Sequence, residues 1–395
     1  MARHRKGLKR LLDFKPKAHA GFSALTRGRP ALAKALDFFP EFGWPRDMAV
    51  LHDSEITSPM AAPRYAEEHA RLLRNNRESL QSGPGIPPYP RLRRVVWEAP
   101  EIYIPGRIIA PVDQSLGRIA SFERAGPTNW SITRPRPFRS GPLRISGRAV
   151  LIPYMKHYGH LLTDVLAPIA FAVHLGLISR GNPVTVVRAR EDNPVSIAFA
   201  EGLLRLGVAR AVTTLGREDS VLADSYLQCE VLASSGEHKY AMPEITPLLR
   251  EIFALGHQGE GERATPAHER VYLTRGDAKL RRVAGEEALI GLLRARGFHI
   301  FESRWDNHAE QLSVFSNCRL LMGIHGAGLA NAIFGRQDAT LIEIQAENAR
   351  KTTGLYWAAC AGMGYKSVFG TAEGPRQSFA IDPEALAREA DHWAS

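Results

Sequence analysis

Two blocks of alternating strand-like and helical patterns constrain this chain more than any other feature. Each block contains short apolar runs of strand length, separated by segments with apolar residues at helical spacing. The first block has strand-like runs at 148–154, 183–189 and 225–233 and helical segments at 160–176 and 194–207. The second has strand-like runs at 270–275, 298–303, 319–324 and 339–345 and helical segments at 285–297, 306–318 and 326–334. Because such alternation is typical of parallel sheets covered by helices, we predict an α/β protein with two such sheets.

Irregular and polar segments mark the expected domain boundaries. Residues 1–90 read as a basic, irregular-to-helical extension that ends in a stretch rich in proline and glycine. A polar segment at 257–269 separates the two blocks and reads as a linker. We therefore expect one domain over 91–257, a second over 268–372, and a C-terminal helix over 373–395 that can return to the first domain.

The charge balance points to an anionic partner. The 395 residues carry a net charge of +10 with a sequence pI of about 9.7, which suits a nucleic acid, a membrane surface or a phosphorylated small molecule. Residues 1–30 hold nine Lys and Arg against the single acid Asp13. This start can rest on anionic lipid or remain a solvated tail. Because it lacks an apolar signal core, we expect a cytoplasmic protein, with peripheral contact to the cytoplasmic membrane as an option.

A glycine-rich turn follows one strand of the second block. Residues 320–334 read LLMGIHGAGLANAIF, which predicts a strand, a turn at His325 and a helix. Gly326 and Gly328 leave the main chain bare, so that free N–H groups and the helix dipole can receive an anion. The imidazole of His325 can donate a hydrogen bond to phosphate or to a developing negative charge. The alternative is a tight turn with close packing between helix and strand.

Charged residues follow two other strands of the second block. Arg275 ends the run VYLTR, and Arg281 and Arg282 come soon after it. Arginine binds a diphosphate through two parallel hydrogen bonds, although a solvated charged loop is the alternative. Glu343 interrupts the apolar run of the last strand, where a lone carboxylate requires a partner. A ribose diol or an arginine of the same domain would supply one.

A histidine and an aspartate lie four residues apart in the first block. His160 and Asp164 share one face of the predicted helix. Asp164 can accept a proton from a substrate, or it can cap the helix or orient His160. His157 would complete a metal triad with this pair, but no fourth ligand is indicated. The three cysteines are far apart and read as reduced, buried thiols without metal spacing.

These segments, taken in order, resemble glycosyltransferase family 61, which includes bacterial capsular-polysaccharide biosynthesis proteins. The resemblance spans roughly 150–344, and its most specific piece, G-x-H-G-A-G-L-x-N, runs from Gly323 to Asn331. It implies a GT-B fold, in which two Rossmann-like domains face each other across a cleft. It also implies an inverting transfer from a nucleotide-sugar donor to a glycan or lipid-linked glycan acceptor, with no cofactor and no metal.

The resemblance assigns a role to each candidate residue. Asp164 would be the base, held by His160, with His160 itself as the alternative base. The donor would be bound by a group of residues in the second block: Arg275, Arg282, His325, Gly326, Ala327, Gly328, Asn331 and Glu343.

Other functions compete with this interpretation. A nucleic-acid-binding protein would fit the charge, but the basic strands lack interleaved aromatic residues. A nicotinamide-dependent oxidoreductase would require a G-x-G-x-x-G turn with an acid about 20 residues further on, which is absent from the sequence. A non-catalytic nucleotide- or polyanion-binding protein of polysaccharide assembly is the remaining alternative.

Overall fold

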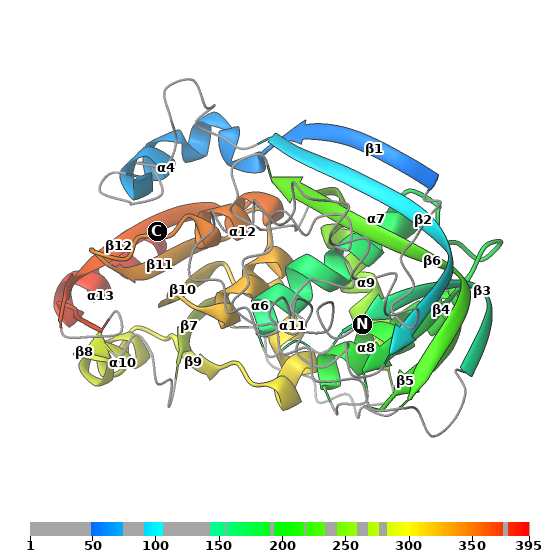
Figure 1. Cartoon of the computed structure of the whole chain (residues 1–395). Coiled ribbons are helices and arrows are strands. Elements are labelled where there is room, and N and C mark those ends of the chain that lie inside the picture. Colours follow the sequence, from blue (N-terminus) through cyan, green and yellow to red (C-terminus); the bar gives the residue numbers. More distant parts are fainter. Residues whose placement is uncertain are drawn as a thin grey trace, which may run out of the picture.

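The structure is a computed structural model that describes a large part of the chain and shows two sheets with helices between and around them (Figure 1). The described residues contain no helix that is both long and apolar enough to cross a membrane. The basic start, with its expected lipid contact, lies outside the described residues, which are 49–73, 91–105, 143–153, 155, 157–189, 193–216, 219–233, 243–258, 268–275, 283–373 and 378–394.

The first sheet is mixed. Its order is β1-β2-β6-β3-β4-β5, in which β6, β3, β4 and β5 are parallel, whereas β1 and β2 join the β6 side as antiparallel strands. The prediction of a parallel sheet is therefore confirmed for β3, β4 and β6; β5 was not predicted, and the antiparallel β1 and β2 make the sheet mixed. The strands are β1 (Ala49–Thr57), β2 (Arg91–Pro105), β3 (Leu143–Ile152), β4 (Val184–Ala189), β5 (Ala209–Leu215) and β6 (Ser220–Ala233).

Helices connect the parallel strands of the first sheet. The α8 helix begins after Asn193, whose side chain accepts hydrogen bonds from two backbone N–H groups of the first turn, and it ends at Gly207 in the left-handed conformation. It packs closely on α9, since a Cβ on Gly202 would lie 1.9 Å from the carbonyl oxygen of Ile252. The helical elements are α6 (Tyr158–His160), the π-helix η5 (Leu161–Leu166), α7 (Ala167–His174), α8 (Pro194–Leu206), η6 (Pro243–Ile245) and α9 (Thr246–Gly256).

The second sheet has the order β8-β13-β12-β11-β10-β7-β9. Its five neighbouring strands β12, β11, β10, β7 and β9 are parallel to one another. Alternate residues of one strand enter different cores: Leu321 packs on the α11 and α12 side, and Met322 packs on the α10 and α13 side. The strands are β7 (Arg270–Thr274), β8 (Val283–Ala284), β9 (His299–Glu302), β10 (Leu320–Ile324), β11 (Thr340–Ala346), β12 (Gly364–Ala372) and β13 (Phe379–Ala380). The helices are α10 (Glu286–Ala295), η7 (Trp305–Asn307), α11 (His308–Asn317), η8 (Ala327–Phe334), α12 (Thr353–Ala361) and α13 (Pro383–Ala394).

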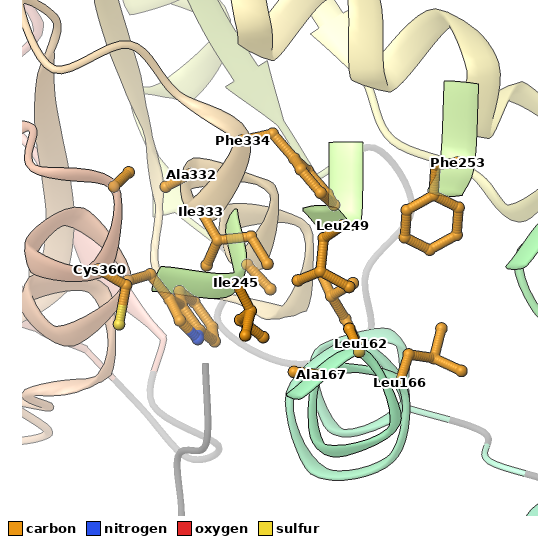
Figure 2. Packing of buried hydrophobic residues seen from close by; sticks show 14 of the residues in the cluster. Leu162, Leu166, Ala167, Ile245, Leu249, Phe253, Ala332, Ile333, Phe334 and Cys360 are labelled. Atoms are coloured by element: carbon orange, nitrogen blue, oxygen red, sulfur yellow. The ribbon is translucent and has the colours of Figure 1, made fainter. Parts of the chain in front are cut away.

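A single apolar core joins the two halves. Figure 2 shows Leu162 and Leu166 of η5 near Leu249 of α9, and Ile333 and Phe334 of η8 on the other side of the same cluster. All five side chains are fully buried. Helices of both halves therefore pack against one another between the two sheets.

Both ends of the described chain differ from the expected domain organisation. Residues expected in the N-terminal extension form β1, which extends the first sheet, two 3₁₀ turns, η2 (Pro59–Ala61) and η3 (Pro63–Tyr65), and α4 (Ala66–Leu73). The carboxylate of Glu68 ties α4 to the second sheet by accepting hydrogen bonds from the N–H and the hydroxyl of Ser367. The C-terminal helix α13 packs on α10 through Leu386 and Ala390, so it stays with the second sheet instead of returning to the first.

Candidate functional site

Two of the candidate residues lie where the connections of the second sheet reverse direction. Across the sheet, its parallel strands stand in the order β9-β7-β10-β11-β12. In the order of the chain these are the second, first, third, fourth and fifth parallel strands. Ligands of open α/β sheets bind outside the carboxyl ends of the strands at such a switch point, which here lies between β7 and β10. Arg275 follows β7 and His325 follows β10. The topology thus brings both residues to the expected edge.

The first sheet has its own switch point beside β3. The neighbours of β3 are β4, the next strand, and β6, the last of the parallel set. His157 and His160 follow the carboxyl end of β3, and α6 packs directly against η8 of the second half. The carboxyl edges of the two sheets therefore meet where α6 contacts η8, which brings the His160 turn and the glycine-rich turn into one region.

The imidazole of His325 is held by a buried carboxylate. Its Nδ1 lies 2.6 Å from Oε1 of Glu343, and its backbone N–H donates to the carbonyl of Ile344. A carboxylate accepts but does not donate, so the proton is on Nδ1 and the ring orientation is set. The side chain of His325 is 11% exposed and that of Glu343 is 0% exposed. This burial leaves His325 as the accessible member of the pair.

The structure places Glu343 in the protein interior, and the ribose contact expected for it stays a prediction. Its second oxygen, Oε2, accepts hydrogen bonds from the hydroxyl of Tyr365 at 2.5 Å and from the amide of Gln345 at 2.8 Å. Glu343 lies within β11, between β10 and β12, and has no exposed surface. The carboxylate is thus enclosed by the protein, and its other oxygen contacts His325.

The two glycines of the turn have different reasons to be glycine. Gly326 has an extended backbone, with φ 174°, but a Cβ there would lie 2.7 Å from Nη1 of Arg275. The same guanidinium donates to the carbonyl oxygen of His325 at 2.5 Å. Gly328 leaves room for Leu273, whose Cδ2 would lie 3.1 Å from an added Cβ. Close packing therefore explains Gly328, whereas at Gly326 the missing side chain makes room for a cation.

The helix predicted after the turn is present as a 3₁₀-helix, η8. It runs from Ala327 to Phe334, and the N–H groups of its first turn have no side-chain cap. The guanidinium of Arg275 lies at this N-terminus, so the arginine cation and the positive end of the helix are adjacent. This arrangement favours an anion at the corner formed by Arg275, His325 and Gly326, which we call the anion corner.

Asn331 makes its contacts inside the protein, and the donor contact predicted for it stays a prediction. Its side chain is fully buried. Its Oδ1 accepts from the hydroxyl of Tyr158 at 2.5 Å, and its Nδ2 donates to Oε1 of Gln311 at 2.7 Å and to the carbonyl of Gly328 at 3.1 Å. With these contacts made inside the protein, Asn331 holds η8 in place and lies away from the surface of the corner.

The predicted pair His160 and Asp164 is in contact. Nδ1 of His160 lies 2.7 Å from Oδ2 of Asp164, and Oδ1 of Asp164 accepts from the hydroxyl of Thr163 at 2.7 Å. The side chain of Asp164 is 2% exposed, whereas that of His160 is 38% exposed. The carboxylate is thus enclosed and orients the imidazole, which is the member of the pair that a substrate can reach.

The third residue of the considered metal triad does not complete a metal site. Nδ1 of His157 accepts the backbone N–H of His160 at 3.4 Å, so His157 caps the start of α6. Its ring centroid lies 4.6 Å from that of His160 in a tilted arrangement. Within the described part of the chain, no group of three or more His, Cys, Asp or Glu side chains is arranged to hold a metal ion.

A π-helix follows His160 where sequence reasoning predicted a regular α-helix. Over Leu161–Leu166 the helix is widened, and the N–H of Ala167 bonds to the carbonyl of Leu162, five residues back. Pro168, which has no N–H, follows directly. The hydroxyl of Thr163 donates to the carbonyl of Gly159 at 2.8 Å, which also disturbs the regular ladder. Single π-helical turns are often found at functional sites.

Sequence reasoning missed several polar side chains around these two turns. Tyr158, His257 and His308 take part in a buried hydrogen-bond chain between the halves. The hydroxyl of Ser303 lies beside Gly328 and is buried without a hydrogen-bond partner among the residues that the structure describes. Lone histidines and a serine give no sequence signal, because only tertiary contacts bring them together. The predicted donor residue Arg282 lies outside the described residues.

The match to a family model agrees with a glycosyltransferase. Residues 158–342 match the family model described as Glycosyltransferase 61. This segment contains both the His160 turn and the anion corner. Among solved structures, the chain is similar to the ADP-heptose LPS heptosyltransferase II of E. coli, with a TM-score of 0.34 and 8% identity over 62% of this chain and 98% of that one. No curated protein matches the chain.

Proposed function

We propose that this protein is an inverting glycosyltransferase that moves a sugar from a nucleoside-diphosphate donor to a glycan or lipid-linked glycan acceptor. The observation that carries the proposal is the meeting of two switch points. The switch point of the second sheet presents Arg275 beside the N-terminus of η8, which has no side-chain cap. The switch point of the first sheet presents the imidazole of His160, which the buried carboxylate of Asp164 orients. The family match over 158–342 supports the same activity.

The donor diphosphate would bind at the anion corner. Arg275 supplies a fixed positive charge, since its Nη1 is anchored on the carbonyl of His325. The N–H groups at the start of η8 supply hydrogen bonds, and His325, whose Nδ1–H is donated to Glu343, can supply one more from Nε2–H in its imidazolium form. In the transfer, the bond between the anomeric carbon and the diphosphate oxygen breaks, and the electron pair leaves with the nucleoside diphosphate. The corner stabilises that developing charge, so this scheme requires no metal or cofactor.

The acceptor would be activated by His160. Because Nδ1 carries the proton that is donated to Asp164, Nε2 holds the lone pair that can take a proton. The acceptor oxygen forms the new bond to the anomeric carbon from the side opposite the leaving group, and its proton passes to Nε2. Asp164 keeps the tautomer and the orientation of the ring. The proposal therefore adopts the alternative of the sequence analysis, in which His160 and not Asp164 is the base.

This mechanism requires a GT-B-like arrangement, in which one half binds the donor and the other half binds the acceptor. Each half has a set of parallel strands whose carboxyl edge is turned toward the other half, as the packing of α6 on η8 indicates. Donor and acceptor would meet at the rim of that contact, beside the apolar core in Figure 2. A role in bacterial surface polysaccharide synthesis, at the cytoplasmic face of the membrane, remains part of this proposal.

A screen of nucleoside-diphosphate sugars tests the proposed function. The purified full chain is mixed with UDP- and GDP-linked hexoses and pentoses, and thermal stabilisation and release of the nucleoside diphosphate are measured. We expect at least one donor to stabilise the protein and to be hydrolysed slowly, with water in place of the acceptor. Stabilisation without any release would favour a non-catalytic nucleotide-binding protein. Binding of single-stranded or duplex nucleic acid, with no response to any donor, would contradict the proposal.

A further inference from the structure

A chain of buried hydrogen bonds crosses from the first half of the protein to the second. We call His257, His308, Tyr158, Asn331 and Gln311 the buried polar chain. Nε2 of His257 lies 2.9 Å from Nδ1 of His308, and Nε2 of His308 lies 3.3 Å from the hydroxyl of Tyr158. That hydroxyl lies 2.5 Å from Oδ1 of Asn331, whose Nδ2 donates to Gln311. His308, Asn331 and Gln311 are at most 2% exposed.

The contacts of Asn331 determine the direction of every bond in this chain. Its Nδ2 lies beside the carbonyl of Gly328, which can only accept a hydrogen bond. The orientation of the Asn331 side-chain amide is therefore fixed. Tyr158 must then donate to Oδ1, and it can only accept from Nε2–H of His308. Burial lowers the pKa of His308 to about 3, so its Nδ1 is a bare acceptor and His257 must be the donor. Because each hydrogen bond in this chain can form with only one donor and one acceptor, the side chains tolerate little displacement.

The buried polar chain ends at the two halves of the candidate site. Tyr158 lies on α6, two residues before His160, and Asn331 lies on η8, five residues after Gly326. The far end of η8 is held from the first half as well, since Nη2 of Arg250 on α9 donates to the carbonyls of Phe334 and Gly335. The helix that begins at the anion corner is thus fixed by groups of the other half. Apolar packing alone would not specify its position to the same degree, because dispersion contacts have no preferred direction.

We propose that Tyr158 and the buried polar chain position His160 relative to the anion corner, so that the acceptor oxygen and the anomeric carbon are held at reacting distance. Tyr158 is a positioning residue, because it acts through α6 and η8 and lies away from the reacting atoms. The inference rests on the proposed glycosyl transfer. Small misplacements of reacting groups lower turnover strongly while they leave ligand binding intact. Loss of the chain should therefore separate turnover from donor binding.

Tyr158→Phe in the full chain tests the inference, and Tyr65→Phe is its matched control. Tyr65 is also buried, and its hydroxyl donates one long-range bond at 2.8 Å to the carbonyl of Met363, away from both turns. With the UDP- or GDP-sugar that the wild type hydrolyses, we expect Tyr158→Phe to lower kcat about tenfold or more and to change the nucleotide Kd by less than about twofold. Tyr65→Phe should change neither quantity. Equal loss of kcat in both variants, or an unchanged kcat in Tyr158→Phe, would overturn the inference.

A second pair of variants at the outer end of the chain gives an independent readout. His257→Gln retains an N–H donor toward His308, whereas His257→Leu removes it. We expect His257→Leu to lower kcat and His257→Gln to stay near the wild type, with nucleotide Kd unchanged in both. This pair decides the question even if Tyr158→Phe fails to fold. Equal kcat values in the two variants would overturn the inference, and a wild type that neither binds nor hydrolyses any donor would overturn it together with the proposed function.

Discussion

At the scale of single residues, two histidine–carboxylate pairs define the candidate site. In each pair the carboxylate is enclosed and the imidazole is more exposed: 2% against 38% for Asp164 and His160, and 0% against 11% for Glu343 and His325. A buried carboxylate fixes both the tautomer and the direction of its imidazole. With Nδ1–H donated to the carboxylate, Nε2 of each ring can take a proton; the proposed role of His160 is that of the base, and the proposed role of His325 is to donate to phosphate in its imidazolium form.

Substitutions in the His160 pair should lower turnover without affecting donor binding. We expect His160→Ala to reduce kcat for donor hydrolysis or transfer by about 10²–10⁴-fold, the usual contribution of a general base. Asp164→Asn keeps the shape but can present an N–H to Nδ1, which favours the wrong tautomer, so kcat should fall as well. Both variants should bind the nucleotide as the wild type does, measured by calorimetry. Normal turnover of His160→Ala would assign the base to another group.

Arg275 should contribute strongly to nucleotide binding. Removal of a charged hydrogen-bond donor typically costs about 1.5–3 kcal/mol, so Arg275→Ala should raise the Kd for the nucleoside diphosphate by about 10-fold or more. Arg270 is a matched control, because it lies at the opposite end of β7 and donates to the carbonyl of Arg296. Arg270→Ala should leave the Kd unchanged. Similar Kd values for the two variants would indicate that the nucleotide binds elsewhere.

The neutral state of His308 should make the free energy of unfolding depend on pH. Burial lowers the pKa of His308 to about 3, whereas an unfolded histidine titrates near 6.5. Below about pH 6.5 the unfolded chain binds a proton that the folded chain does not, so the folded state loses stability as the pH falls toward 3. Between pH 7 and pH 5, His308 should lower the free energy of unfolding by about 2 kcal/mol. Urea unfolding of the wild type and of His308→Gln should differ in this slope, and identical slopes would contradict the assignment.

At the scale of elements, η8 connects the anion corner to the first half of the protein. Its N-terminus is shaped by the space that Gly326 leaves for Arg275, and its C-terminal carbonyls are held by Arg250. The three atoms nearest to a Cβ at Gly326 all belong to the end of the flexible Arg275 side chain, and the backbone there is extended, so we expect alanine to be compatible with the fold. The substitution would instead displace the guanidinium from the corner.

Gly326→Ala should therefore weaken nucleotide binding while the protein remains folded. Gly291→Ala on α10 is the control, since an added Cβ there meets no atom within 4 Å and alanine favours a helix. We expect an increased nucleotide Kd for Gly326→Ala only, with both variants unfolding cooperatively by circular dichroism. An unchanged Kd for Gly326→Ala would show that the position of Arg275 does not matter for binding.

At the scale of the whole molecule, the two halves share one apolar core. Phe253 of α9 and Phe334 of η8 are both fully buried, and their ring centroids lie 5.9 Å apart across the contact between the halves. A core of this kind couples the stability of the two sheets. Relative movement of the halves during catalysis would have to preserve this contact.

The shared core predicts a single unfolding transition for the two halves. In scanning calorimetry we expect one peak, with equal calorimetric and van't Hoff enthalpies. Phe334→Ala should lower the free energy of unfolding by about 3–5 kcal/mol and still give one peak, because it removes a large side chain from the joint core. Two resolved peaks in the wild type would contradict the coupling.

The sequence by itself determined the α/β class, the two blocks of parallel strands and the local pairing of His160 with Asp164. These follow from periodicity and from a spacing of four residues, which are short-range properties of the chain. It also indicated Arg275 and His325, because strand ends are visible as the last residues of apolar runs.

Only the tertiary structure decided which polar groups are enclosed and which are accessible. Glu343 pairs with His325 because β11 lies beside β10 in the register that places Glu343 opposite Gly323. Asn331 faces Tyr158 because α6 packs on η8. The antiparallel strands β1 and β2 depend in the same way on a partner strand far along the chain. Whether a side chain is buried depends on contacts between segments that are distant in the sequence. A local sequence pattern does not contain this information.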